Sequence, residues 1–164
     1  MLIILKEVFM NINIICFGKI DSKNALHLAK DYQDKIVHYT KLNIVELQEE
    51  INSDLKSAMV KNEKKITDKL ANLKNSTIIL ADINGAQITS EQLAKMIENN
   101  KDFQGGNLTF VIGPSDGFSP EFKNKYQNKI SFGQITLPHQ LFRIILLEQI
   151  FRSFKIMNNE KYHK

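Results

Sequence analysis

Short apolar runs alternate along this chain with longer segments in which apolar residues recur every three or four positions. A run over residues 12–18 is followed by the segment 22–39, where Leu26, Ala29 and Ile36 share one helical face. An apolar run of this length predicts a strand, and the 3.6-residue period predicts a helix. The same alternation predicts four further strands, over residues 43–47, 77–82, 108–112 and 129–132.

Helices are expected between these strands, over residues 54–73, from Thr89 onward, from Ser119 onward and over 138–157. Thr89 with Gln92 three residues later is a capping-box pattern, and Ser119 followed by Pro120 is a typical helix start. A turn is expected at residues 84–85, where Asn precedes Gly. Five strands separated by helices predict an α/β fold: an open, mainly parallel sheet with helices on both faces.

The last predicted helix has almost no polar face. Such a helix is buried all round, and in a small domain a second subunit is the simplest cover, so we expect a homodimer. The alternative is a helix at the centre of one subunit. Glu148 and Arg152 lie four residues apart on this helix and are expected to pair. Its apolar positions are Leu141, Phe142, Ile144, Ile145, Leu146, Leu147, Ile150, Phe151 and Phe154.

The chain has 164 residues, 43% of them hydrophobic, which suits one domain with a sizeable core. We expect that domain over residues 10–164. Residues 1–9 are apolar but interrupted by Lys6 and Glu7, and we expect an extension outside the fold, with no targeting or membrane segment. The single cysteine, Cys16, lies in an apolar run and is expected to be a buried structural thiol, which fits a reducing cytoplasm.

The net charge of +4 permits an anionic partner without requiring one. Ligands of open parallel sheets bind beyond the carboxyl ends of the strands, which directs attention to residues 82–87, 113–119 and 133–139. The sequence lacks the glycine fingerprints of dinucleotide and nucleoside-triphosphate sites. It also lacks the nucleophile motif of hydrolases and any cluster with metal-ligand spacing, so no metal is expected.

The chain ends in a polar, basic segment that finishes with Tyr162, His163 and Lys164. Most such tails are frayed and inert. The alternative is a functional tail, since an aromatic ring can stack, an imidazole can exchange a proton and an ammonium can neutralise phosphate.

Several segments carry a resemblance to a known family: FVIGPSDG at 110–117, ITLPHQ at 135–140, Arg143, LEQIFR at 147–152 and the terminal YHK at 162–164. Together they resemble the ribosomal large-subunit methyltransferase H family over residues 10–164. The resemblance implies a SPOUT fold, with a trefoil knot in the carboxyl-terminal part. It also implies a homodimer that methylates N3 of a pseudouridine in 23S ribosomal RNA, acting on the assembled ribosome.

In this family the knot loops hold S-adenosylmethionine through backbone contacts, and the partner subunit's tail reaches the target base. From the chemistry of methyl transfer to N3, we expect His163 to accept the proton, Tyr162 to be a platform for the base, and Lys164 or Arg143 to stabilise the developing anion. His139 is expected to hold the knot loop. Carried over by position from the family, the residues expected to bind the cofactor are Ala81, Gly113, Phe132, Gly133, Gln134, Ile135, Thr136 and Leu137.

Two positions depart from the family pattern. Ala81 stands where Leu is usual, which loosens apolar packing on the adenine, and Pro114 stands where a second Gly is common, which removes a backbone N–H. Two other functions stay open: a SPOUT methyltransferase that acts on transfer RNA or another ribosomal site, and a non-catalytic ribosome assembly factor. A saturable S-adenosylmethionine site would distinguish an enzyme from a pure binding protein.

Overall fold

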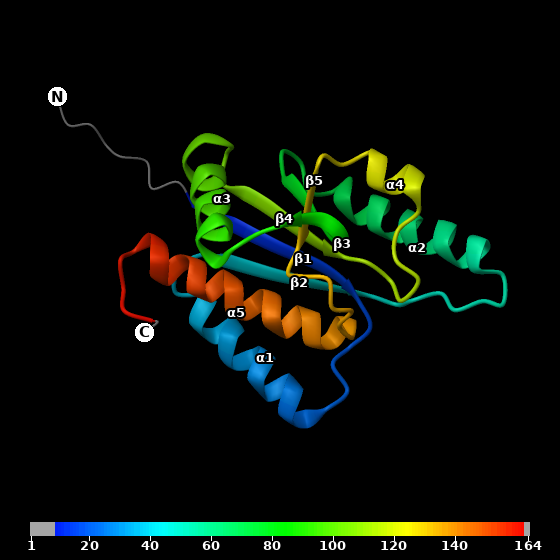
Figure 1. The fold of residues 1–164 in the computed structure, drawn as a ribbon, viewed down its shortest axis with the longest axis horizontal. Helices are drawn as coiled ribbons and strands as arrows, with labels where there is room; N and C mark the ends of the chain where they lie inside the picture. Colours follow the sequence, from blue (N-terminus) through cyan, green and yellow to red (C-terminus); the bar gives the residue numbers. More distant parts are fainter. Residues whose placement is uncertain (1–8, 163–164) are drawn as a thin grey trace.

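The structure, a computed structural model, describes residues 9–162. Within that range five strands form one sheet in the order β2-β1-β4-β3-β5, and every neighbouring pair is parallel (Figure 1). The prediction of a mainly parallel α/β sheet is confirmed. The elements are β1 (Asn11–Phe17), α1 (Lys23–Ile36), β2 (Lys41–Leu47), α2 (Leu55–Leu70), β3 (Thr77–Gln87), α3 (Ser90–Phe103), β4 (Asn107–Ile112), α4 (Pro120–Asn124), β5 (Asn128–Ser131) and α5 (His139–Met157).

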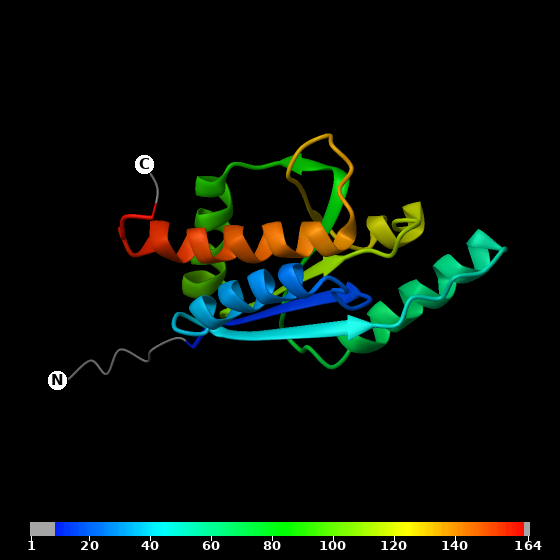
Figure 2. The ribbon, with the colours of Figure 1, turned by 90° about the horizontal axis from the view of Figure 1, so that it is seen from below.

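Helices cover both faces of the sheet, as predicted. Figure 2 shows α1 and α5 along one side of strands β1 and β2, and Ile66 and Leu70 of α2 pack on the other face of the sheet. Successive strand residues point to opposite faces, so Ile12 and Ile14 of β1 join a core with α1, α3 and α5, whereas Ile15 and Phe17 join a second core with α2 and α4. These two apolar cores fix the three layers.

The predicted helix starts agree with the structure. The Thr89 hydroxyl accepts the Gln92 amide and the Gln92 side chain accepts the Thr89 amide, which is the expected capping box. Ser119 caps α4 with Pro120 at its first position. Two helices are shorter at their carboxyl ends than predicted: α1 ends at Ile36 and not at residue 39, and α2 ends at Leu70 and not at residue 73.

The strand predicted over residues 77–82 is longer in the structure, because β3 continues to Gln87. The expected turn at 84–85 lies inside the strand, where the pairing with β5 shifts between Ala81 and Ala86. A Cβ on Gly85 would lie 2.7 Å from the Lys129 carbonyl carbon, so only glycine permits this close approach of two backbones. The irregularity carries the chain over β5 and toward α3 (Figure 1).

Helix α5 packs between α1 and α3, and eight of its nineteen residues are buried within one subunit. Helices α1 and α3 therefore supply part of the cover that was predicted for this helix. Leu141 and Ile156 stay 45% and 37% exposed. The homodimer remains a prediction. The buried residues of α5 are Arg143, Ile144, Leu146, Leu147, Ile150, Phe151, Ser153 and Phe154.

Cys16 is a free, buried thiol, as predicted. Burial raises its pKa to about 11, although the nearby Arg143 guanidinium acts in the opposite direction. Phe9 is exposed whereas Met10 is buried, and residues 1–8 lie outside the described range, so the extension over 1–9 stays a prediction. Among residues 9–162 no helix has the length and apolar character needed to cross a membrane.

Candidate active site

A cavity of about 630 Å³ opens at the carboxyl ends of β3, β4 and β5. Three segments form most of it: residues 81–84 of β3, residues 112–118 from the end of β4 onward, and residues 130–137 from the end of β5 onward. Lys123 of α4 and His139 and Phe142 of α5 complete the lining. Both the place and the volume are typical of a site for a small organic ligand in an open parallel sheet.

Glycines allow the loop after β4 to line this cavity closely. A Cβ on Gly113 would lie 3.0 Å from the Phe118 ring, and Gly117 has a φ of +75°, which favours glycine. The Gly117 amide donates to the Pro114 carbonyl at 2.9 Å and closes a turn. The loop thus presents backbone and small polar side chains to the cavity.

The segment after β5 is shaped by its own contacts. The Ser131 hydroxyl donates to the Gly133 carbonyl at 2.8 Å and accepts the Gly133 amide at 3.2 Å. The Phe132 ring stacks on Phe142 of α5, with ring centroids 5.1 Å apart. Ile135 is 81% exposed, although isoleucine is usually buried, so it presents an apolar side chain beside the cavity.

One ion pair lies in the lining. Lys123 of α4 contacts the Asp82 carboxylate at 3.1 Å, and the Asp82 side chain is only 8% exposed. Asp82 also accepts the Asn84 amide at 3.1 Å. The pair ties α4 to the end of the regular part of β3. No cluster of three or more metal-ligating side chains occurs in the described part of the chain.

All eight residues expected to bind the cofactor line this one cavity, although they come from three segments: Ala81 from β3, Gly113 from the loop after β4, and residues 132–137. Sequence reasoning missed Lys123 and Phe142. The sequence indicates Phe142 only as an apolar position of the last helix, and the sequence around Lys123 offers no signal of a cavity. Asp82 lies in one of the three loops where a ligand was expected, but no motif assigns it a role.

Arg143 lies elsewhere. Its side chain is 2% exposed and donates to Glu46 at 2.6 Å and to the Gly18 carbonyl at 2.8 Å. It also donates to the Phe17 carbonyl at 3.3 Å, and it is not among the cavity residues. The guanidinium therefore fastens the start of α5 to the carboxyl ends of β1 and β2.

Tyr162 packs against the far part of α5. Its ring meets Phe151 edge-on at 4.9 Å and lies 4.9 Å from the Arg152 guanidinium, and its hydroxyl donates to Glu148 at 3.3 Å. Burial, chiefly, raises the pKa of this phenol to about 12. The expected pair of Glu148 and Arg152 is confirmed, with two hydrogen bonds at 3.0 and 2.5 Å. His163 and Lys164 lie outside the described residues.

The tail is thus remote from the cavity of its own chain. Phe142 lines the cavity, and Phe151, on which Tyr162 packs, follows nine residues later on the same helix. At 1.5 Å per residue this separation is about 13 Å. The predicted cofactor residues and the described part of the predicted catalytic tail are not brought together within one chain.

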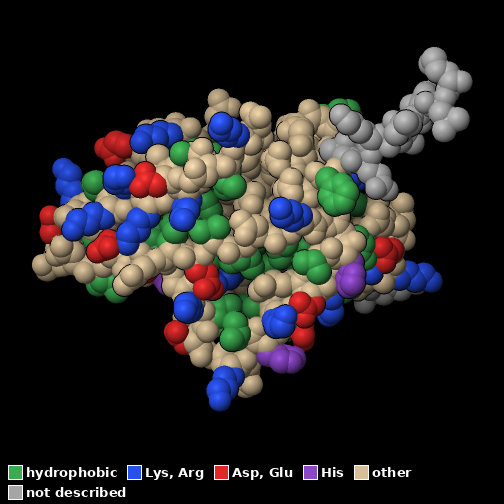
Figure 3. Space-filling view, turned by 180° about the vertical axis from the view of Figure 1, so that it is seen from behind, with side chains coloured by type: hydrophobic (Ala, Val, Ile, Leu, Met, Phe, Trp, Pro, Cys, Tyr) green, Lys and Arg blue, Asp and Glu red, His purple; other side chains and the backbone are tan. Residues whose placement is uncertain are grey.

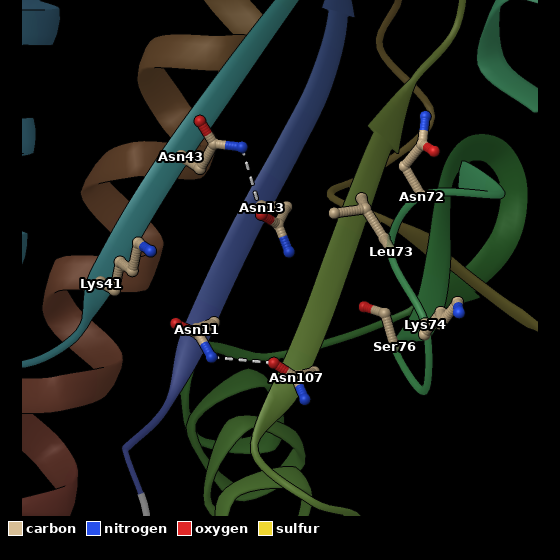
Figure 4. A pocket seen from close by; sticks show the side chains of 9 residues that line it. All are labelled: Asn11, Asn13, Lys41, Asn43, Asn72, Leu73, Lys74, Ser76 and Asn107. Carbon is tan, nitrogen blue, oxygen red and sulfur yellow. Dashed lines mark hydrogen bonds between the residues drawn. The ribbon is translucent and has the colours of Figure 1, made fainter. Parts of the chain in front are cut away.

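A second cavity, of about 570 Å³, lies at the amino ends of the strands (Figure 4). Its asparagines bond one another, Asn11 to Asn107 at 2.9 Å and Asn43 to Asn13 at 3.4 Å. These positions alternate with core residues along the same strands, on the part of the sheet that α2 leaves uncovered. Their hydrogen bonds to one another account for these polar side chains on the sheet. The full lining is Asn11, Asn13, Lys41, Asn43, Asn72, Leu73, Lys74, Ser76 and Asn107.

Comparisons with known proteins agree with this geometry. The family model described as "Predicted SPOUT methyltransferase" matches residues 10–163. Proteins named ribosomal RNA large subunit methyltransferase H are 44% identical in Mycoplasma mycoides, 47% in Mesoplasma florum and 41% in Fusobacterium nucleatum, each over 94% of this chain and 100% of the relative. The crystal structure of a putative methylase family protein from Neisseria gonorrhoeae matches with a TM-score of 0.51 and 16% identity, over 90% of this chain and 84% of that one.

That structural likeness concerns the fold alone, whereas the sequence matches span the cavity and α5. The resemblance drawn from the sequence motifs is confirmed. The chain therefore belongs to the SPOUT methyltransferase family and, within it, to the family of ribosomal RNA large subunit methyltransferase H.

Proposed function

We propose that this protein transfers the methyl group of S-adenosylmethionine to N3 of a pseudouridine in 23S ribosomal RNA of the assembled ribosome. The relatives' names give the reaction class and the large-subunit RNA. The single observation that carries the proposal is that eight residues, chosen by motif position from three separate segments, line one cavity.

The residues present fit S-adenosylmethionine. Apolar side chains of Ile112, Phe132 and Leu137 suit an adenine ring, and the backbone of residues 132–137 supplies donors and acceptors for its edge. A side chain at Gly113 would press on Phe118, so glycine keeps the cavity open there. Ala81 leaves more room than leucine would. Pro114 offers no N–H to the cofactor, but it lines the cavity without closing it.

When bound, S-adenosylmethionine supplies a methyl group already activated by its sulfonium. The protein's own residues then have to orient the base, exclude water and take up the N3 proton. We assign proton uptake to His163, stacking on the base to Tyr162 and stabilisation of the developing anion to Lys164. The contacts of Arg143 support an indirect role, in which it holds α5 and the segment before it in place.

A homodimer that completes the site is part of this proposal. Tyr162 packs about 13 Å along α5 from the cavity of its own chain, so a partner subunit is needed to supply a tail there. Exposed apolar side chains on the two adjacent helices α1 and α5 support an interface on this face. They are Leu26, Val37, Leu141 and Ile156, which are 51%, 54%, 45% and 37% exposed.

We also assign the trefoil knot of the family to this chain. Residues 133–137 line the same cavity as residues 81–84 and 112–118, so the segment that leads into α5 lies close to two earlier segments of the chain. Threading of the carboxyl-terminal part through a loop requires such proximity. It supports the knot, which general folding rules disfavour.

The face opposite α1 and α5 offers a surface for RNA phosphates. Figure 3 shows lysine side chains gathered, with some carboxylates, over the region of α2. Five lysines lie on this helix, and Lys64 and Lys65 are paired with Asp68 and Glu50. Contacts of this kind make binding salt-dependent. The lysines are Lys56, Lys61, Lys64, Lys65 and Lys69.

The proposal is tested by titrating the protein with S-adenosylmethionine in a calorimeter and then supplying ribosomes from a strain that lacks this enzyme. Saturable binding and transfer of labelled methyl to 23S RNA are expected. Absence of saturable binding would favour the assembly factor. Binding without transfer to ribosomes, but with transfer to transfer RNA, would favour another SPOUT substrate.

A further inference from the structure

Two glutamates outside the cavity accept hydrogen bonds from the loop 113–119 that lines it. The Glu49 carboxylate accepts the Ser115 amide at 2.7 Å and the Ser115 hydroxyl at 3.1 Å. The Glu63 carboxylate accepts the Ser119 amide at 2.6 Å and the Ser119 hydroxyl at 3.0 Å. Each carboxylate thus uses both oxygens on one serine, and neither glutamate lines the cavity.

We propose that Glu49 and Glu63 are positioning residues, which hold this loop in the shape that binds S-adenosylmethionine. The inference rests on the cofactor site proposed above and extends it to residues that never touch the cofactor. Nothing in the sequence motifs assigns a role to either glutamate.

The loop needs such support because it lies between β4 and α4 without regular structure. Pro114 has no N–H, and Gly117 has a positive φ that suits a turn but also makes the unrestrained chain more adaptable. The Gly117 amide bonds to Pro114 within the loop. The glutamates hold Ser115, which lies inside this turn, and Ser119, which follows it.

The contacts of Ser119 show how the Glu63 carboxylate positions both the cavity loop and helix α4. Its hydroxyl oxygen accepts the Phe122 amide at 3.1 Å and thereby caps α4. The same hydroxyl donates its proton to Glu63, which leaves the oxygen lone pairs directed at the helix. Glu63 therefore fixes the end of the cavity loop and the start of α4 together.

The position of α2 explains how Glu63 reaches the loop. Figures 1 and 2 show that α2 projects beyond the carboxyl ends of the strands, on the side of α4. Hydrogen bonds to a charged acceptor are shorter and stronger than neutral ones, and the amide distances of 2.6 and 2.7 Å agree with that class.

The test uses the full-length variants Glu49→Gln and Glu63→Gln and measures the dissociation constant for S-adenosylmethionine by calorimetry. Glutamine keeps the size but removes the negative charge that strengthens both hydrogen bonds, and its amide N–H cannot accept the proton of the serine hydroxyl. We expect each variant to bind about tenfold more weakly. The kcat at saturating cofactor should change by less than about twofold, since no reacting atom is touched. Glu98→Gln, at an exposed glutamate of α3, is the matched control and should bind normally.

A double-mutant cycle assigns the effect to the contact itself. If Glu49 acts through Ser115, the variant Glu49→Gln/Ser115→Ala should bind scarcely more weakly than Glu49→Gln alone. A lowered melting temperature with an unchanged dissociation constant would overturn the proposal, because it would mean a purely structural role. The proposal would also be overturned if the wild type binds S-adenosylmethionine and both variants bind it with the same dissociation constant. Wild-type protein without saturable binding would overturn the cofactor site itself.

Discussion

Replacing Gly113 with alanine tests how tightly the cavity is built. The added Cβ would lie 3.0, 3.1 and 3.2 Å from three carbons of the Phe118 ring. That ring cannot retreat freely, because it stacks on Phe122 with centroids 5.3 Å apart, and Phe122 in turn packs on Tyr126 at 5.1 Å. Phe122 is buried and belongs to the core between the sheet and α2. The variant therefore has to shift the loop or a stack of three rings.

The size of the effect follows from overpacking. One extra methyl group in a well-packed core costs about 1–3 kcal/mol. With about 2 kcal/mol and a domain of this size, the melting temperature should fall by about 4–8 °C. Because the shifted atoms line the cavity, the dissociation constant for S-adenosylmethionine should rise about tenfold, equivalent to about 1.4 kcal/mol.

Differential scanning fluorimetry and calorimetry measure both quantities. The double variant Gly113→Ala/Phe118→Leu removes the ring that the methyl group meets, and it should bind the cofactor better than Gly113→Ala alone. If Gly113→Ala binds and melts like the wild type, the close approach of residue 113 to Phe118 does not limit the cavity. The reasoning from steric fit would then be refuted.

Three further predictions follow from the tail and the last helix. Deleting residues 162–164 should abolish methyl transfer yet leave cofactor binding within about twofold, because all eight residues assigned to the cofactor are retained. Normal turnover by the truncated enzyme would disprove a catalytic tail. Arg143→Met should lower the free energy of unfolding by about 1–3 kcal/mol in urea titrations, since it removes the donor to the Gly18 carbonyl and to Glu46, whose side chain is 36% exposed and can be hydrated. Arg152→Met, at a less buried arginine on the same helix, should cost less. Because the folded pKa of Tyr162 is raised to about 12, its contribution to stability is complete below the unfolded value near 10 and is lost as pH rises through 12. The difference in ultraviolet titration between wild type and Tyr162→Phe should show a phenol that ionises near 12, and ionisation near 10 would contradict the packing.

The sheet and most helix boundaries could be predicted because they depend on local periodicity and capping. Thr89 with Gln92 marks the start of α3 whatever surrounds it. The course of β3 beyond residue 82 could not be predicted, since an Asn-Gly pair usually ends a strand. Here Gly85 instead permits contact with the backbone of β5, a partner more than forty residues away.

The candidate site was predictable only to the extent that motifs marked it. The motif positions lead to eight residues that line one cavity. The contacts from Glu49 and Glu63 join residues 66 and 56 positions apart, and such pairs leave no periodic or compositional trace. The apolar sequence of α5 indicated burial, but the packing of α1 and α3 against it could not be predicted, because periodicity shows that a helix is apolar and not what packs on it.

The central claim is tested most directly by supplying the protein and labelled S-adenosylmethionine to ribosomes from a strain that lacks this enzyme, and then mapping the modified nucleotide. We predict one labelled pseudouridine, methylated at N3, in 23S RNA of the assembled ribosome. Label on another nucleotide or on transfer RNA would contradict the substrate, and absence of label with ribosomes, free 23S RNA and transfer RNA alike would contradict an RNA methyltransferase.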